Sequence, residues 1–180
     1  MKAPSSAIAL LLVLSTQAQL SAQATPPAPP TRAQVMAAAK EIMLAARYTT
    51  LITIGSDGRP QARIVDPFPP ESDLTIWIGT NPVTRKVQEI RGDPRVTLMY
   101  FSPAELEYVT VHGTAVLDTA AAQKAAHWKP EWAYLYKDQN RGEDYVLFRV
   151  KPSRLEVVST KRGIANDPKT WRPVTVDLPK

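Results

Sequence analysis

The chain has 180 residues and a formal net charge of +5, with 44% hydrophobic and 22% charged residues. The charges alternate in sign along the chain, which is typical of a soluble protein and excludes the basic stripe that nucleic-acid binding needs. The absence of Cys excludes disulfides, and two His residues make a zinc site improbable, so we predict no metal centre. The length fits one domain with a sizeable core.

The first 24 residues have the three parts of a secretory signal peptide. Met1-Lys2 supplies a positive charge, Ala7–Leu14 is a short apolar run, and Ala22-Gln23-Ala24 is a cleavage site of small residues. The apolar run is far shorter than the ~20 residues that span a bilayer, and a short anchor that is never cleaved is the alternative. We therefore expect residues 1–24 to be a signal peptide, and the protein to be periplasmic or secreted, with no membrane attachment after cleavage.

Three helices and two flanking segments are predicted around the strands. Residues 25–31 form a Pro-rich spacer, and Thr31 is expected to cap a helix that runs to about Arg47. Shorter helices are predicted over Asn81–Gly92 and from Asp118 to about His127. Residues 161–180 are expected to form a C-terminal extension that is mostly coil.

The remaining chain is rich in β-branched and aromatic residues in short alternating runs, which predict strands. The predicted strands are Tyr48–Ile54, Pro60–Val65, Leu74–Gly79, Arg95–Phe101, Tyr108–Leu117, Tyr145–Val150 and Leu155–Val158. A doubly wound parallel sheet needs a helix between nearly all strands, and this order lacks them. The pattern therefore favours a mainly antiparallel barrel with small peripheral helices.

Several basic and hydroxyl residues gather around the start of the second predicted helix. Thr80 ends a strand there, and Thr84-Arg85-Lys86 lies in the first turn, where the helix dipole is already positive. Cations, a hydroxyl and backbone N–H groups together favour an anion, most naturally a phosphate, which Arg63 could also reach. Gly79 would leave room for a flat ligand. The alternative is that Arg85 and Lys86 are a solvated helix face and that Gly79 marks a bulge.

Seven short motifs in order also carry a family resemblance. They are Leu51-Ile-Thr-Ile-Gly-Ser-Asp-Gly-Arg-Pro60, Ala62-Arg-Ile-Val65, Ile76-Trp-Ile-Gly-Thr80, Thr84-Arg-Lys-Val87, Asp93-Pro-Arg-Val96, Tyr108-Val-Thr-Val-His-Gly113 and Trp128-Lys-Pro130. The run Thr49–Val158 resembles the pyridoxamine 5′-phosphate oxidase-like FMN-binding split barrels, in particular the general stress protein branch. The resemblance implies a domain over residues 32–160 with a six-stranded antiparallel split β-barrel, mainly β in class. It also implies a homodimer with FMN in two clefts at the subunit interface.

The resemblance assigns cofactor contacts to particular positions. Arg63 and Lys86 would hold the FMN phosphate, with Thr84 and Arg85 beside them. The residues implied to line the isoalloxazine ring are Ile64, Val65, Ile78, Gly79 and Thr80. Tyr108 stands where relatives present a polar side chain from the partner subunit.

The C-terminal residues depart from the family pattern. True pyridoxamine phosphate oxidases bind their substrate with a further Arg/His set, which residues 170–180 do not match. The best-known reaction of the family is therefore not expected to carry over, and the sequence names no catalytic acid or base.

Histidines and aromatic residues outside these motifs have simpler interpretations. His112, on a strand, is interpreted as a structural or interface residue, and His127 as packing at a helix end. Trp128, Trp132, Tyr134 and Tyr136 form an aromatic cluster for which core and dimer packing is the default, because such rings bury large areas. A lid over a flat ligand is the alternative.

Three functional hypotheses follow from the sequence. The first is an exported FMN-dependent oxidoreductase acting on an unidentified small molecule, since flavin chemistry belongs to the ring. The second is a non-enzymatic flavin or flat-ligand binding or stress module, and the third is a ligand-free structural protein of the envelope. A deazaflavin or haem in place of FMN stays open. No Arg-Arg pair precedes the apolar run, so export should be of the unfolded chain, and a cofactor would be captured outside the cytoplasm.

Overall fold

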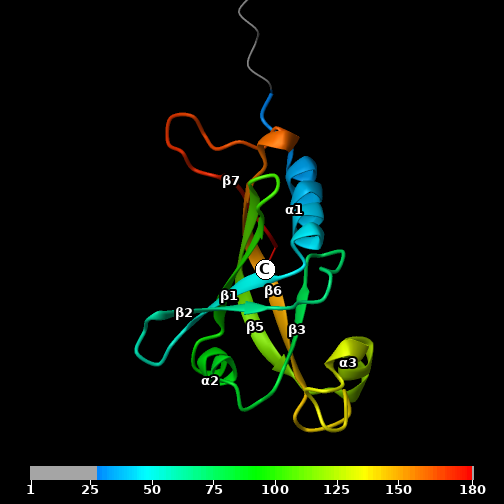
Figure 1. The fold of residues 1–180 in the computed structure, drawn as a ribbon. Helices are drawn as coiled ribbons and strands as arrows, with labels where there is room; N and C mark the ends of the chain where they lie inside the picture. The colour runs from blue at the N-terminus through cyan, green and yellow to red at the C-terminus, as the bar shows by residue number, and fades with distance from the viewer. Residues whose placement is uncertain (1–27, 180) are drawn as a thin grey trace, which may run out of the picture.

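A computed structural model describes residues 28–179 (Figure 1), so the predicted signal peptide and the first residues of the predicted spacer lie outside the described part. The helices are α1 (Arg32–Ala46), α2 (Arg85–Gly92) and α3 (Ala121–Ala126), with short 3₁₀ turns η1 (Pro130–Trp132) and η2 (Thr160–Arg162). The strands are β1 (Thr49–Ile54), β2 (Pro60–Val65), β3 (Ile76–Thr80), β4 (Arg95–Ser102), β5 (Glu107–Asp118), β6 (Val146–Val158) and β7 (Val174–Asp177). Among the described helices, none has the length and apolar character needed to cross a membrane.

All strand pairs of the sheet are antiparallel. The sheet has seven strands, six of them in the order β2-β1-β4-β5-β6-β3, with β7 paired to β6 off this path. The predicted mainly antiparallel β fold with small helices is therefore confirmed, and the strand count is seven instead of six. Strands β5 and β6 form the long centre of the sheet, and α1 lies along one side of it (Figure 1).

The last two predicted strands are in fact one. Residues 146–158 run as a single strand, although Pro152 predicts a break because proline cannot donate to a sheet ladder. Pro152 pairs with Gly113 at a shift of register, where the bulge tolerates the missing N–H. A Cβ on Gly113 would collide with the Lys151 carbonyl, so glycine is required for this close approach.

The C-terminal extension contributes a strand that the sequence analysis missed. Strand β7 pairs with the second half of β6, and Val176, opposite Leu155, is buried, whereas Thr175 and Asp177 are exposed. Four residues after a proline give too short an alternation to recognise in sequence. Residues 161–180 are thus attached to the sheet through this strand.

Helix α1 and one face of the sheet enclose the main core. The predicted cap is present: the Thr31 hydroxyl accepts from the Gln34 N–H at 3.3 Å, and the Gln34 side chain accepts from the Thr31 N–H at 2.8 Å. The buried residues of α1 are Val35, Ala38, Ala39, Ile42 and Met43, and they share one core with the inward side chains of the strands. This face of the sheet is therefore filled by α1 and the core side chains.

Candidate functional site

A cleft of about 350 Å³ lies where the ends of β2 and β3 approach the start of α2. The predicted site residues that line it are Ile64, Val65, Gly79, Thr80, Thr84 and Lys86. The other lining residues are Asp66, Asn81, Trp132, Leu135 and Tyr136. The structure thus brings together most of the predicted set, and it adds a wall from residues 128–136, the aromatic segment.

Helix α2 begins later than predicted. Thr84, placed in the first turn by the sequence analysis, is the residue before the helix, and the segment from Asn81 to Val83 is a turn. The Asn81 side-chain oxygen accepts from the Val83 N–H at 3.1 Å, and the Asn81 backbone carbonyl accepts from the Thr84 hydroxyl at 2.8 Å. This local bonding competes with helix formation. The Thr80 and Thr84 hydroxyls then lie 3.2 Å apart at the cleft.

Lys86 is the cation of the cleft. It is half-buried, and burial is the main reason that its pKa is lowered from 10.5, with the charge of Arg63 lowering it further and Glu89 acting in the opposite sense. It lies in the first turn of α2, where the positive end of the helix dipole adds to the same unfavourable field. An anion placed beside Lys86 would offset the cost of keeping this ammonium charged.

Arg63 does not border the cleft. Strand β2 is an edge of the sheet and half exposed, and Arg63 is on its less exposed side. Its guanidinium donates to the Thr53 hydroxyl at 2.5 Å and to the Glu89 carboxylate at 2.6 Å. Arg63 is therefore near the predicted phosphate site, with its charge already matched.

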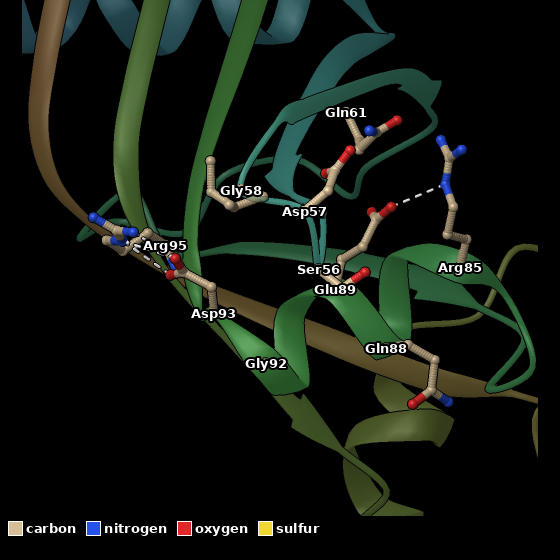
Figure 2. A pocket seen from close by; sticks show the side chains of 12 residues that line it. Ser56, Asp57, Gly58, Gln61, Arg85, Gln88, Glu89, Gly92, Asp93 and Arg95 are labelled. Atoms are coloured by element: carbon tan, nitrogen blue, oxygen red, sulfur yellow. Dashed lines mark hydrogen bonds and ion pairs between the residues drawn. The ribbon is translucent and has the colours of Figure 1, made fainter.

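Arg85 also turns to Glu89, from the opposite side. Its Nε lies 2.9 Å from Glu89 Oε1, and the pair borders a larger cavity of about 780 Å³ between the β1–β2 hairpin and α2 (Figure 2). Asp57, Asp93 and Arg95 also line this cavity, so its charges are mixed. The sequence analysis missed Glu89; the available signal was its spacing four residues after Arg85, the distance at which helical ion pairs form.

Ile78 and Gly79, both expected against the flavin ring, have other neighbours. The Ile78 side chain is 1% exposed and belongs to the main core. A Cβ on Gly79 would come within 2.5 Å of the Trp132 ring and 2.8 Å of Tyr145. The space that the glycine leaves is thus filled by aromatic rings, and only its backbone side is available to the cleft.

The predicted aromatic cluster exists with a different membership. Tyr134 is 84% exposed, and Tyr145 takes its place in edge-to-face contacts with Trp128 and Tyr136. These rings pack around buried Trp77 as a second small core. Packing is therefore confirmed as the role of most of the cluster.

Part of the same segment still reaches the cleft. Trp132, Leu135 and Tyr136 line it, and the segment is fastened to the end of β2 by Lys129, whose Nζ lies 2.6 Å from Asp66 Oδ1. This ammonium also lies 4.9 Å from the centroid of the Trp132 ring. A long-range contact of this kind leaves no local sequence signal, so the wall of the cleft could not be placed from the pattern.

The two histidines lie outside the cleft. His112 Nδ1 is 3.2 Å from the Thr97 hydroxyl, and its Nε2 is 3.6 Å from Glu156, both on neighbouring strands. His127 stacks on the Trp77 ring with centroids 4.4 Å apart, at the end of α3. Both have contacts typical of structural histidines.

Comparisons with known proteins agree with this architecture. Within the solved structures, a Clostridium acetobutylicum protein related to general stress protein 26 superposes with a TM-score of 0.67 at 14% identity, over 80% of this chain and 94% of its own. General stress protein 26 of Bacillus anthracis gives 0.60 at 18%, over 77% and 98%. A pyridoxamine 5′-phosphate oxidase-related, FMN-binding protein of Nostoc punctiforme gives 0.56 at 16%, over 86% and 100%. At these identities the likeness shows a shared fold.

Sequence comparison supplies the family. No curated protein matches the chain. The profile of the pyridoxamine 5′-phosphate oxidase family, however, matches residues 35–159, which span α1 through the end of β6. The chain therefore belongs to the pyridoxamine 5′-phosphate oxidase family and has its split-barrel fold.

Proposed function

We propose that this protein binds FMN in the cleft between β2, β3 and α2. The observation that carries the proposal is the half-buried ammonium of Lys86, which borders the cleft together with the paired hydroxyls of Thr80 and Thr84. A phosphate would accept a hydrogen bond from the Lys86 ammonium and give it an anionic partner, and it would accept from the two hydroxyls once they rotate away from each other and from the Asn81 carbonyl. Family membership and the FMN-binding Nostoc punctiforme protein of the same fold support this choice of ligand.

The other end of the cleft suits a flat, largely apolar ring. Ile64 and Val65 border it from β2, and Trp132 and Leu135 border it from the aromatic segment. The volume of about 350 Å³ is at the lower end of the roughly 300–1,000 Å³ typical of ligand pockets. The residues present thus fit FMN at both ends of the cleft, whereas Arg63 and Arg85 do not line it and are ion-paired with Glu89.

A second copy of the chain would complete the site. Ile64, 68% exposed, and Met99, 40% exposed, are both register partners of Thr50, so that two exposed apolar side chains flank this threonine in one row across the outer face of the sheet. Phe101, on the same face of β4, is 47% exposed beside Tyr108. Ile64 also lines the cleft. We infer a homodimer in which the partner covers this row and, with it, the open side of the cleft.

The activity inferred for the holoprotein is oxidation or reduction of a small molecule. Bound FMN would supply the electron-transfer chemistry, and the chain would bind it and limit access to it. A binding module without turnover is the second candidate, because few ionisable side chains line the cleft that could act as a catalytic acid or base. Among the described residues there, the ionisable side chains are Lys86, Asp66 and Tyr136. Asp66 is ion-paired with Lys129, and burial raises the pKa of Tyr136.

Export is part of the proposal and rests on the sequence of residues 1–24. The test is to fractionate cells of the native host and to measure the intact mass and the N-terminal peptide of the recovered protein. A mature protein beginning at Thr25 in the exported fraction is the expected result, and a full-length chain in the cytoplasmic fraction would refute it.

The test of FMN binding is a fluorescence titration of the purified protein with FMN and with riboflavin. Lys86→Ala should weaken FMN binding about 10- to 100-fold, the loss expected for one hydrogen bond to a charged group, with riboflavin binding unchanged. Lys161→Ala is the matched control, because Lys161 is an exposed lysine paired with Glu105 at 2.9 Å. If FMN and riboflavin both fail to bind the unmodified protein, the proposal is wrong.

Turnover separates the two candidate functions. FMN-loaded protein would be reduced by NADH, NADPH or dithionite and then mixed with oxygen and quinones. An oxidoreductase should transfer electrons from the reductant to the acceptor at a higher rate than free FMN does under the same conditions. A binding module should show no rate above that of free FMN.

A further inference from the structure

Glu89 lies between Arg63 and Arg85. Its Oε2 is 2.6 Å from Arg63 Nη2 and accepts from the Thr53 hydroxyl at 2.5 Å, and its Oε1 is 2.9 Å from Arg85 Nε. The side chain of Glu89 is only 6% exposed. Both of its oxygens are therefore occupied by donors that belong to β1, β2 and α2.

This arrangement divides the cations of the site into two groups. Lys86 lines the cleft, whereas Arg63 does not, and Arg85 lines the larger cavity beside Glu89 (Figure 2). One terminal nitrogen of Arg63 bonds Thr53 and the other bonds Glu89, so both ends of its guanidinium fork are in use. A phosphate that recruited Arg63 would therefore compete with Glu89, a carboxylate that carries the same sign of charge.

Burial makes the competition significant. The Arg63 side chain is 19% exposed, so water gives little help to a guanidinium whose partner has been removed. In the ligand-free protein, Glu89 also offsets the repulsion that Arg63 exerts on Lys86. Glu89 thus stabilises the cations when no anion is present and opposes an anion when one arrives.

We propose that Glu89 determines the specificity of the cleft by competing with a ligand phosphate for Arg63 and Arg85. The inference rests on the proposed flavin binding and goes further: the opposition of Glu89 offsets the gain that Lys86 gives to a phosphate, so the cleft accepts flavins with and without it. Riboflavin and FMN should therefore bind the unmodified protein with dissociation constants within about threefold of each other, which is a free-energy difference of under 1 kcal/mol.

The experiment is a titration of FMN and riboflavin against the unmodified protein, Glu89→Gln and Glu107→Gln. Glutamine keeps the shape of the side chain and removes its charge. Glu89→Gln should bind FMN about tenfold more tightly, as expected when one opposing charge near a protein surface is removed, with no change for riboflavin.

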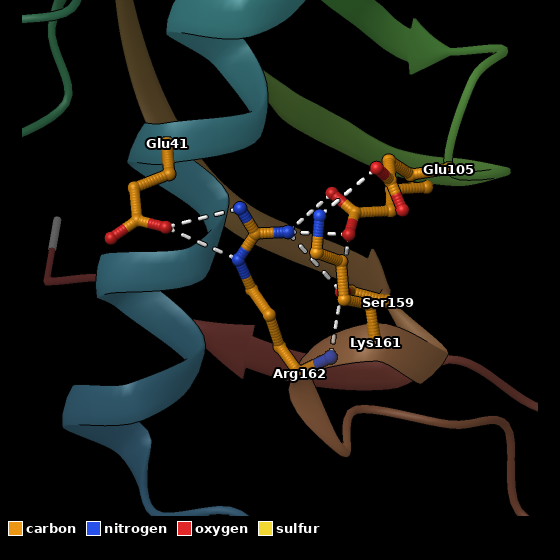
Figure 3. Close-up of polar contacts among 6 residues, drawn as sticks. Glu41, Glu105, Ser159, Lys161 and Arg162 are labelled. Carbon is orange, nitrogen blue, oxygen red and sulfur yellow. Dashed lines mark hydrogen bonds and ion pairs between the residues drawn. The ribbon is translucent and has the colours of Figure 1, made fainter.

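Glu107→Gln is the matched control. Glu107 is 3% exposed and contacts Arg162 and Ser159, in a cluster that also includes Glu41 on α1 (Figure 3). Its substitution removes the same charge and the same kind of buried ion pair away from the cleft. The ratio of the two flavin dissociation constants should stay as in the unmodified protein.

A thermal melt gives a second readout. Glu89→Gln without ligand should melt below the unmodified protein, because Arg63 loses its partner, and saturating FMN should raise its Tm more than that of the unmodified protein. If this variant does not fold, Glu89→Asp replaces it. The shorter carboxylate cannot reach both arginines, and it should tighten FMN binding to a smaller extent.

Three outcomes would overturn the inference, and one of them also overturns the proposed function. If Glu89→Gln weakens FMN binding, Glu89 positions Arg63 for the phosphate instead of competing with it. If the unmodified protein and Glu89→Gln both bind FMN much more tightly than riboflavin, and the ratio of the two dissociation constants is the same in both, Glu89 has no effect on specificity. If no protein binds either flavin, flavin binding itself is wrong.

Discussion

The backbone of Gly79 packs so closely against the Trp132 ring that a Cβ at this position would lie 2.5 Å from Cζ3. Strand β3 and the aromatic segment are far apart in sequence and meet at this contact, beside the cleft. Gly79→Ala should therefore lower the free energy of unfolding by about 1–3 kcal/mol, the usual cost of overpacking.

Urea unfolding measures this loss, and near-UV circular dichroism should show a disturbed aromatic signal. Gly92→Ala is the control, since nothing lies within 4 Å of a Cβ there. It should leave both signals close to those of the unmodified protein. A Gly79→Ala protein of unchanged stability would mean that Trp132 moves freely away from β3.

Lys86 should make stability rise with pH. Burial, with the charge of Arg63, lowers its pKa in the folded protein below the ordinary 10.5, so between these two values the unfolded chain binds more protons. The penalty from Lys86 is fully present below the folded pKa and disappears as pH rises towards 10.5. Lys86→Met should thus be more stable than the unmodified protein at pH 7 without ligand, and the difference should shrink with pH.

Urea unfolding at several pH values up to about 10 measures this difference. Lys86→Arg is the control, because an arginine stays charged throughout and should show no such pH-dependent gain. An unmodified protein that is more stable than Lys86→Met at pH 7 would contradict the prediction.

Lys129 should hold the aromatic wall of the cleft in place. Its ammonium bonds Asp66 Oδ1 at 2.6 Å and the Pro67 carbonyl at 3.0 Å. Lys129→Ala should cost about 1.5–3 kcal/mol, as for a hydrogen bond to a charged group, and should speed deuterium uptake over residues 128–136. Hydrogen-exchange mass spectrometry checks this, with Lys161→Ala as an exposed ion-pair control that should leave that segment protected.

Met99 should be buried in the inferred homodimer. A charge in the middle of the apolar row on the outer face of the sheet would be desolvated on association, so Met99→Glu should convert a dimer to a monomer. Light scattering after size-exclusion chromatography measures the mass. Trp171→Glu, at a 77% exposed site in the C-terminal loop, should stay dimeric. A Met99→Glu dimer would place the interface elsewhere.

Much of the fold and part of the candidate anion site could be predicted from local sequence pattern. Alternation of apolar and polar residues predicted β1, β2, β4 and β5 closely, because one face of each strand packs on the core. The Thr31 cap predicted the start of α1. The cluster of Thr80, Thr84 and Lys86 followed from residue type and from the start of a helix, which are both local properties.

Other features were decided by contacts between distant residues. Pro152 lies inside β6 because a bulge opposite Gly113 accepts it, and nothing near Pro152 in sequence indicates this. The charge of Arg63 is taken up by Glu89 on another element, and Trp132 fills the space beside Gly79. Residue type and spacing identified which groups could bind an anion. Only the packing of the sheet against α2 decided which cation borders the cleft, because side-chain pairing depends on distances that the chain sets when it folds.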